Sequence, residues 1–194
     1  MNQPDVVSAL EPLIKVLNRL NIPYYVGGSI ASSTYGAFRA TRDVDMVFNL
    51  DPKHVDELVN SLKSQYYIDR DMILEAIQHR SSFNLIHLKT MFKIDVFILK
   101  ERTFDHESFK RKKENKIDAS TNLTVYVSSP EDVILHKLEW YRAADHISDR
   151  QWSDVLSVLK VQGDRLDMSY MENWAKKLGI LDLLEKALSE IPKN

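Results

Sequence analysis

Residues 43–50, DVDMVFNL, place two carboxylates inside an apolar run, and no other stretch constrains the fold of this chain as strongly. The residues alternate in polarity, which is typical of a β-strand with one buried face. Asp43 and Asp45 lie two positions apart, so both side chains leave the strand on the same face. Two such carboxylates repel each other and resist burial unless a cation neutralises them. The stretch therefore predicts a strand with an apolar face and a cation-binding face.

A third carboxylate, Asp95, lies in the middle of a second alternating stretch, residues 92–99, FKIDVFIL. If this stretch is a strand of the same sheet, Asp95 can join Asp43 and Asp45 from the side. Three carboxylates on one face suit two Mg²⁺ ions about 4 Å apart, the arrangement used for in-line phosphoryl transfer. The alternatives are a solvent-facing pair on an edge strand and a lone acid at Asp95 that points outward.

A glycine turn, Gly27-Gly28-Ser29, follows the short apolar run YYV and precedes the acidic strand. Glycines let backbone N–H groups approach phosphate oxygens closely, and a helix that begins at Ser29 directs its positive end at an anion. We therefore expect Gly28 and Ser29 to bind phosphate. Ser29 can also cap the helix, and the two roles are compatible. Arg39 and Arg42 either contact phosphate or a polynucleotide, or pair with a nearby acid in solvent.

The chain changes character near residue 128. Before this point helical periodicity alternates with strand patterns, and strands are expected over residues 24–26, 43–50, 83–90, 92–99 and 123–127. After it, Ser129 and Pro130 begin a helix, and three more helices are expected over about 149–161, 168–178 and 180–190. The sequence thus predicts an α+β fold. Residues 1–128 form a mixed β-sheet flanked by helices, and residues 129–194 form a C-terminal helical bundle packed on it.

Composition limits the cofactors and partners. The 194 residues include no cysteine, which excludes disulfides, thiolate metal sites and a cysteine nucleophile, and which favours a cytoplasmic location. No apolar run is long enough for a spanning helix, and the N-terminus predicts an amphipathic helix rather than a signal peptide. The net charge is −2, so contact with nucleic acid requires a local patch. Residues 110–116, with five positive groups and one negative, form either a solvated loop or a landing site for an RNA backbone.

The glycine turn and the acidic strand together carry a family resemblance. One pattern resembles the signature of the nucleotidyltransferase superfamily, whose founding member is DNA polymerase beta. It consists of Gly28-Ser29, a spacer of thirteen residues and then Asp43-Val44-Asp45. The fuller pattern GGS, Tyr-Gly, Arg-x-Thr-x-Asp-Val-Asp resembles small bacterial nucleotidyltransferase-like proteins that include the AbiEii toxins. The helix with Ser-Pro-Glu-Asp-x-x-x-x-Lys-Leu, residues 129–138, and Asp154-Val155-Leu156 are similar to later segments of that group.

The resemblance implies a nucleotidyltransferase-like fold and a role for each matching residue. Asp43 and Asp45 would bind Mg²⁺ and, through it, the nucleoside triphosphate. Asp95 would be the third metal ligand and would help to deprotonate the attacking hydroxyl. Gly28 and Ser29 would hold the β- and γ-phosphates, and Lys137 would contact the triphosphate.

The expected reaction is transfer of a nucleoside monophosphate from an NTP to a hydroxyl group, with release of pyrophosphate. The acceptor would be RNA, a protein side chain or a small molecule. If the chain is a toxin of a toxin–antitoxin pair, tRNA ends become the favoured acceptor and a cognate antitoxin becomes a partner. Two alternatives remain: a catalytically silent binding or regulatory module with the same fold, and an α/β interaction protein without a nucleotide site.

Overall fold

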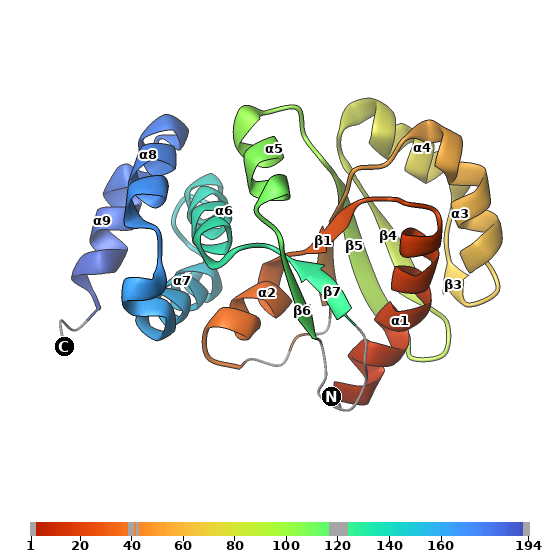
Figure 1. Cartoon of the computed structure of the whole chain (residues 1–194), viewed down its shortest axis with the longest axis horizontal. Coiled ribbons are helices and arrows are strands. Elements are labelled where there is room, and N and C mark those ends of the chain that lie inside the picture. Colours follow the sequence, from red (N-terminus) through yellow and green to blue (C-terminus); the bar gives the residue numbers. More distant parts are fainter. Residues whose placement is uncertain (1–2, 39–40, 42, 117–123, 192–194) are drawn as a thin grey trace. The chain divides into compact units, whose positions relative to one another are not determined.

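The computed structural model describes residues 3–38, 41, 43–116 and 124–191. The chain divides into two compact units. The first, called here the sheet unit, contains every described strand together with α1 and α3 to α5 (Figure 1). The second, the helical unit, contains α2 and α6 to α9.

One mixed sheet runs through the sheet unit, as the sequence predicted. Its order among the described strands is β3-β4-β5-β2-β1-β7-β6 (Figure 1). β2 pairs with β5 in parallel, β1 pairs with β7 in parallel, and the other neighbours are antiparallel. The bounds are β1 Tyr24–Val26, β2 Asp43–Phe48, β3 Tyr66–Tyr67, β4 Ser82–His87, β5 Phe92–Ile98, β6 Lys113–Lys116 and β7 Thr124–Val127.

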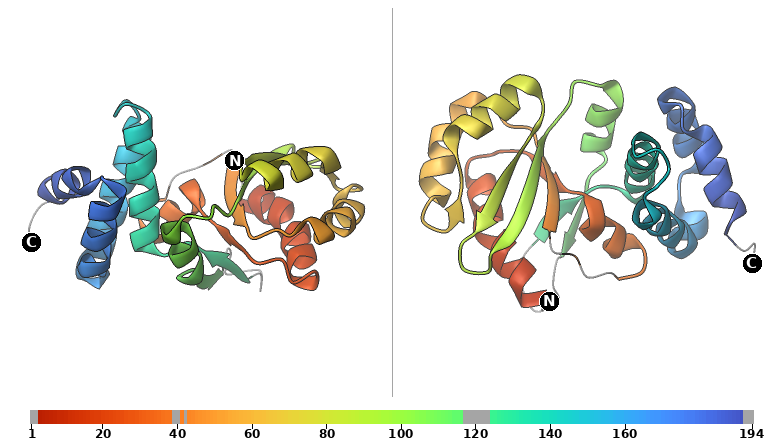
Figure 2. Two further views of the ribbon diagram at one scale, coloured as in Figure 1. Left: turned by 90° about the horizontal axis from the view of Figure 1, so that it is seen from above. Right: turned by 180° about the vertical axis from the view of Figure 1, so that it is seen from behind.

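Three helices bury the apolar face of the central strands. They are α1 (Gln3–Arg19), α3 (Val55–Leu62) and α4 (Arg70–His79), which pack against one another and against β4 and β5. A short 3₁₀ helix, Pro52–His54, precedes α3. The alternation of β2 and β5 explains this packing, because one parity of each strand is fully buried: Val44, Met46, Phe48, Ile94, Val96 and Ile98. The right view of Figure 2 shows β4, β5 and β2 side by side on the other face of the sheet.

That other face is covered only in part. Tyr25 pairs with Val47 in the β1–β2 register, so both lie on the face that carries Asp43 and Asp45. Phe109 of α5 (Thr103–Lys110) packs there with Tyr25 and Leu99, and Val47 packs against this cluster. The two aspartates remain half-buried and accessible at the start of β2.

The helical unit groups α2 (Gly28–Tyr35) with the C-terminal helices. These are α6 (Pro130–Ala143), α7 (Asp149–Gln162), α8 (Met168–Leu178) and α9 (Leu181–Ser189), with a 3₁₀ helix over Gly163–Arg165. The Gln162 side chain donates to the Tyr35 carbonyl at 2.6 Å, and the Ala37 N–H donates to Ser157 Oγ at 2.6 Å. A Cβ at Gly36 would lie 2.7 Å from Ser157 Oγ, so only glycine permits this approach of α2 to α7.

Most elements match the sequence-based prediction, and the differences are two edge strands and one helix. Ser129 caps α6 and Pro130 begins it, as predicted. β3, β6 and α5 were not predicted, and β6, with the sequence KENK, lies where a solvated loop was one of two expectations. An edge strand exposed on both faces has no alternation to reveal it. Within the described residues, no helix has both the length and the apolar character needed to cross a membrane.

Candidate active site

The three predicted carboxylates meet on one face of the sheet. β2 and β5 are parallel neighbours in which Asp45 pairs with Asp95 and Asp43 pairs with Lys93. Paired residues on adjacent strands point to the same side and lie about 5 Å apart. Asp95 therefore shares the half-buried face of Asp43 and Asp45, and the alternative in which it points away does not hold.

A lysine that the sequence analysis did not single out lies among these carboxylates. Lys93 Nζ is 2.8 Å from Asp95 Oδ1, with the lysine side chain 48% exposed and the aspartate 19%. The hydrogen bond to Asp95 raises the pKa of Lys93, and the charges of Asp95, Asp43 and Asp45 add to this effect. One ammonium group is thus stabilised by all three acids. The signal was present in the sequence, because Lys93 precedes Asp95 by two residues and so shares its face.

Local hydrogen bonds fix the start of the acidic strand. Thr41 Oγ1 lies 2.7 Å from Asp43 Oδ1 and 3.1 Å from the Asp43 carbonyl. The Gly27 N–H donates to the Asp45 carbonyl at 2.9 Å, which ties the glycine turn to β2 within the sheet unit. Arg39 and Arg42, the other predicted residues on this loop, lie outside the described residues.

The three carboxylates are suitable ligands for a divalent cation. In the present conformation, however, their side chains are not arranged around a single metal position. Carboxylate oxygens are the ligands that Mg²⁺ prefers, and three of them converge here. In the part of the chain that the structure describes, no three His, Asp or Glu side chains form a group that could hold a metal ion. Asp95 is turned instead to Lys93. For Asp95 to bind a metal ion at this face, its ion pair with Lys93 therefore has to break.

The predicted phosphate-binding residues begin α2 in the helical unit. Gly28 has a φ of +53°, a backbone conformation that disfavours any side chain. The helix begins at Gly28, so Ser29 lies within its first turn rather than just before it. The first N–H groups of a helix have no acceptor within the helix itself, an arrangement that suits an anion. Within the same unit, Ser32 Oγ lies 3.1 Å from the Ser29 carbonyl.

Lys137, the predicted triphosphate contact, is buried in the helical unit. Its Nζ lies 2.8 Å from Asp154 Oδ2 and 2.9 Å from Gln151 Oε1, and the residue is 5% exposed. Ser32 Oγ is 3.3 Å from the same Asp154 oxygen. This network links α6, α7 and α2. Sequence reasoning noted Asp154 only through the family resemblance and missed Ser32, because no local pattern relates residues so far apart in the chain.

Solved structures of nucleotidyltransferases have the same fold. The solution structure of the antibiotic-resistance factor ANT(2'')-Ia matches with a TM-score of 0.59 at 11% identity, over 95% of this chain and 99% of that chain. A crystal structure of ANT(2'')-Ia in complex with adenylyl-2''-tobramycin matches with a TM-score of 0.54 at 15% identity, over 94% and 98% of the two chains. An antigenic nucleotidyltransferase-like protein from Paracoccidioides brasiliensis matches with a TM-score of 0.52 at 17% identity, over 98% and 94%.

These likenesses confirm the predicted nucleotidyltransferase-like fold. No protein-family model matches the sequence, and no curated protein matches it either. The closer resemblance to AbiEii-type proteins stays a prediction.

Proposed function

We propose that this chain is a Mg²⁺-dependent nucleotidyltransferase that transfers a nucleoside monophosphate from an NTP to a hydroxyl group. The β2–β5 register carries the proposal, because it sets Asp43, Asp45 and Asp95 on one half-buried face. Such a set of oxygen ligands suits the metal chemistry of phosphoryl transfer. The fold shared with known nucleotidyltransferases supports the same reaction class.

The three carboxylates would hold two Mg²⁺ ions. When bound, these ions would neutralise the triphosphate and the charge that develops on the leaving group. Before Asp95 can act as a ligand or accept a proton, its ion pair with Lys93 has to open. Asp95 would then take the proton of the acceptor hydroxyl. The hydroxyl oxygen would bond to the α-phosphorus as the bond from that phosphorus to the β-phosphate oxygen breaks, and pyrophosphate would leave.

The first turn of α2 would bind the phosphates. The backbone N–H groups at Gly28 and Ser29 would donate to the β- and γ-phosphate oxygens. The predicted direct contact of Lys137 with the triphosphate stays a prediction. Its buried network supports a positioning role instead, in which Asp154 and Ser32 hold α2 in place. Arg39 and Arg42 would contact phosphate or a polynucleotide.

Three classes of acceptor are compatible with this reaction, and each implies a different biological role. ANT(2'')-Ia has been solved with an adenylylated tobramycin, so in that protein a small molecule carries the nucleotide. The AbiEii resemblance instead favours RNA, with tRNA ends as acceptor, a toxin role and a cognate antitoxin partner in the cytoplasm. A protein side chain is the third class of acceptor.

A second function, a catalytically silent binding or regulatory module, is favoured by one observation. Lys93 supplies Asp95 with a cationic partner from the chain itself, at 2.8 Å. A silent module would retain this ion pair in the presence of Mg²⁺ and NTP.

The decisive experiment is incubation with each radiolabelled NTP, Mg²⁺ and either total RNA or the protein alone. Label transferred to RNA or to protein supports the enzyme. The Asp43→Asn variant should lower the transfer rate by on the order of 10²–10³-fold, the usual effect of losing one group that stabilises transition-state charge. Asp71→Asn, an exposed position on α4, is the matched control and should transfer at the wild-type rate.

Binding separates the two functions when no label is transferred. Mg²⁺ and NTP affinities are measured by calorimetry for wild type and Asp43→Asn. Equal affinities in both proteins would remove the support for a metal–nucleotide site, whereas loss of affinity without transfer would favour the silent module.

A further inference from the structure

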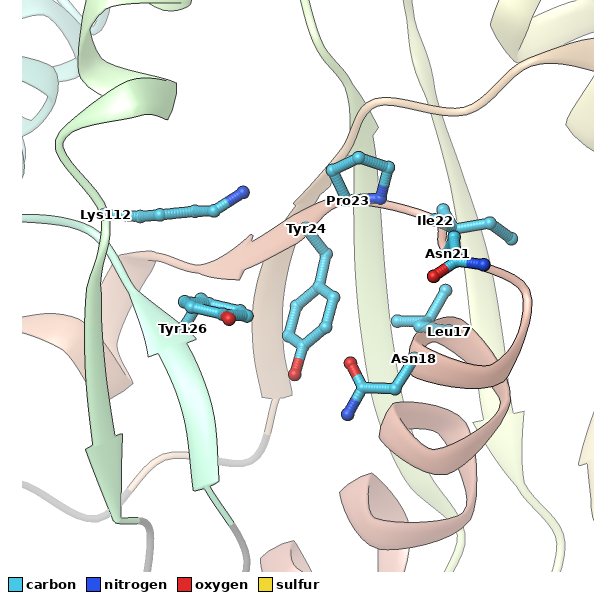
Figure 3. Close-up of a pocket in the computed structure, with 8 residues that line it drawn as sticks. All are labelled: Leu17, Asn18, Asn21, Ile22, Pro23, Tyr24, Lys112 and Tyr126. Atoms are coloured by element: carbon cyan, nitrogen blue, oxygen red, sulfur yellow. The ribbon is translucent and has the colours of Figure 1, made fainter.

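A concavity of the sheet unit lies where α1 ends, beside β1 and β7. It has a volume of about 340 Å³, and its polar lining consists of Asn18, Asn21, Tyr24, Lys112 and Tyr126 (Figure 3). We call it the tyrosine pocket. Leu17, Ile22 and Pro23 supply apolar surface beside these groups.

The tyrosine pocket and the three carboxylates involve different residues of the sheet unit. In the β1–β2 register Tyr24 pairs with Phe48, whereas the next residue pairs with Val47. Paired strand residues share a face and successive residues alternate, so Tyr24 lies on the face opposite Asp43 and Asp45. None of the three carboxylates of the proposed active site lines the pocket.

Tyr24 is an unsatisfied group at the centre of the pocket. The residue is 1% exposed, and its hydroxyl lies near the Tyr126 backbone without a hydrogen bond of good geometry to any described residue. Figure 3 shows the hydroxyl end of Tyr24 directed between Tyr126 and the side chain of Asn18. Burial raises the pKa of Tyr24 to about 12, so the hydroxyl stays protonated and able to donate. A buried hydroxyl without a partner costs stability, and a ligand that bonds to it would recover this cost.

The pocket also contains the side chain of Lys112, a cation that is not paired with a carboxylate of the described residues. Lys112 Nζ lies 4.0 Å from the centre of the Phe109 ring and 5.2 Å from that of Tyr126. Burial lowers the pKa of Lys112, and no carboxylate in the described part of the chain pairs with it. A desolvated ammonium that is stabilised only by aromatic rings favours an incoming anion.

Two further lysines follow Lys112 in β6, a strand at the edge of the sheet. β6 carries Lys113 and Lys116, both exposed and neither in an ion pair with any described residue. These two positions lie about 10 Å apart at strand spacing, farther than one phosphate group reaches, and their side chains leave opposite faces of β6. Glu114 is the opposing charge, because it pairs with Tyr126 in the β6–β7 register. The ligand must therefore offer several anionic groups in series beside one flat ring.

We propose that the tyrosine pocket and β6 bind single-stranded nucleic acid. An unpaired base stacks on Tyr126, which is 39% exposed, and its edge bonds to the Tyr24 hydroxyl and the two asparagine amides. The adjoining phosphates lie on Lys112 and on Lys116. Lys116 is two residues from Glu114 and so shares the face of Tyr126. These contacts do not distinguish RNA from DNA, because none of the groups recognises the sugar.

The test measures binding alone, without NTP or Mg²⁺, so its failure leaves the proposed reaction untouched. Fluorescence anisotropy follows a short labelled single-stranded RNA, the same sequence as DNA, and an RNA duplex. Tyr126→Ala should weaken binding of the single strands by about five- to 150-fold, the usual loss for one stacked base. Tyr67→Ala, an exposed tyrosine on β3 at the opposite edge of the sheet, is the matched control and should bind like wild type.

Charge variants test the phosphate contacts. Lys112→Gln should reduce the slope of log affinity against log salt by about one, and Glu114→Gln should tighten binding. Tyr126→Phe keeps the ring and should bind like wild type, which separates loss of stacking from loss of folding.

Two results would overturn the proposal: Tyr126→Ala with the affinity of Tyr67→Ala, or duplex RNA bound as tightly as single strands. Absence of binding to both single strands at low salt would overturn it too. Equal affinity for RNA and DNA supports the proposed contacts, and a preference for one identifies the natural ligand.

Discussion

Two lysine–aspartate pairs, one in each unit, have the same N–O distance of 2.8 Å and opposite environments. Lys93 and Asp95 lie on the half-open face of the sheet, with side chains 48% and 19% exposed. Lys137 and Asp154 lie inside the helical unit, at 7% and 10%. Water and mobile ions compete for an exposed pair and hardly reach a buried one. Burial rather than distance therefore separates an exchangeable ion pair from a fixed one.

The buried pair should give the largest effect when it is broken. Lys137→Met leaves Asp154 as a buried charge without its lysine, which destabilises a protein by about 3–5 kcal/mol. Urea unfolding measures the loss. The double variant Lys137→Met/Asp154→Leu removes both charges and should recover most of the stability. A single-variant loss below about 1 kcal/mol would mean that the helical unit admits water to the pair.

The exposed pair should affect metal binding more than folding. Lys93→Gln should change the free energy of unfolding by less than about 1 kcal/mol, because exposed pairs contribute little. It should also raise Mg²⁺ affinity by up to about fivefold, the factor that corresponds to ~1 kcal/mol, because Asp95 no longer has a competing cation. Calorimetric titration of the protein with Mg²⁺ checks this, with Lys63→Gln at the C-cap of α3 as the matched control. Weaker Mg²⁺ binding in Lys93→Gln would instead show that the lysine assists the site.

The buried face of the same sheet should exclude charge, and the pH dependence of stability that arises from His87 tests this. Burial lowers the pKa of His87 from 6.5, and the charge of the nearby Lys89 adds to this effect. The folded state therefore binds the proton less readily than the unfolded state, so stability falls as the pH drops below about 6.5. The loss levels off once the pH lies below the folded-state pKa. It amounts to about 1.4 kcal/mol for every tenfold difference in proton affinity between the two states.

Chemical denaturation of wild type and His87→Phe between pH 7.5 and about 5 measures this slope. The variant should lack the contribution of His87, while Thr90, which bonds to the ring at 2.8 Å, stays in place. Parallel stability curves for the two proteins would show that the face tolerates the charge.

Sequence prediction succeeded where the information is local. Alternation in residues 43–50 identified β2, and a serine followed by proline identified the start of α6. It failed for β6, whose four polar residues form a strand only because β7 pairs with them. The contact of Lys137 with a triphosphate, implied by the family resemblance, stays a prediction, and its helix taken alone does not reveal that α7 brings Asp154 to it.

The sequence by itself determined that Asp43 and Asp45 share a face, since the pleat of one strand sets that relation between residues two apart. It also determined that Gly28 can adopt the left-handed backbone that begins α2. Only the tertiary structure decided that Asp95 lies beside Asp45, because parallel pairing of β2 with β5 joins residues fifty positions apart. It likewise decided which lysine is exposed and which is buried. Both outcomes depend on how the elements pack, and packing is a property of the folded chain rather than of any one segment.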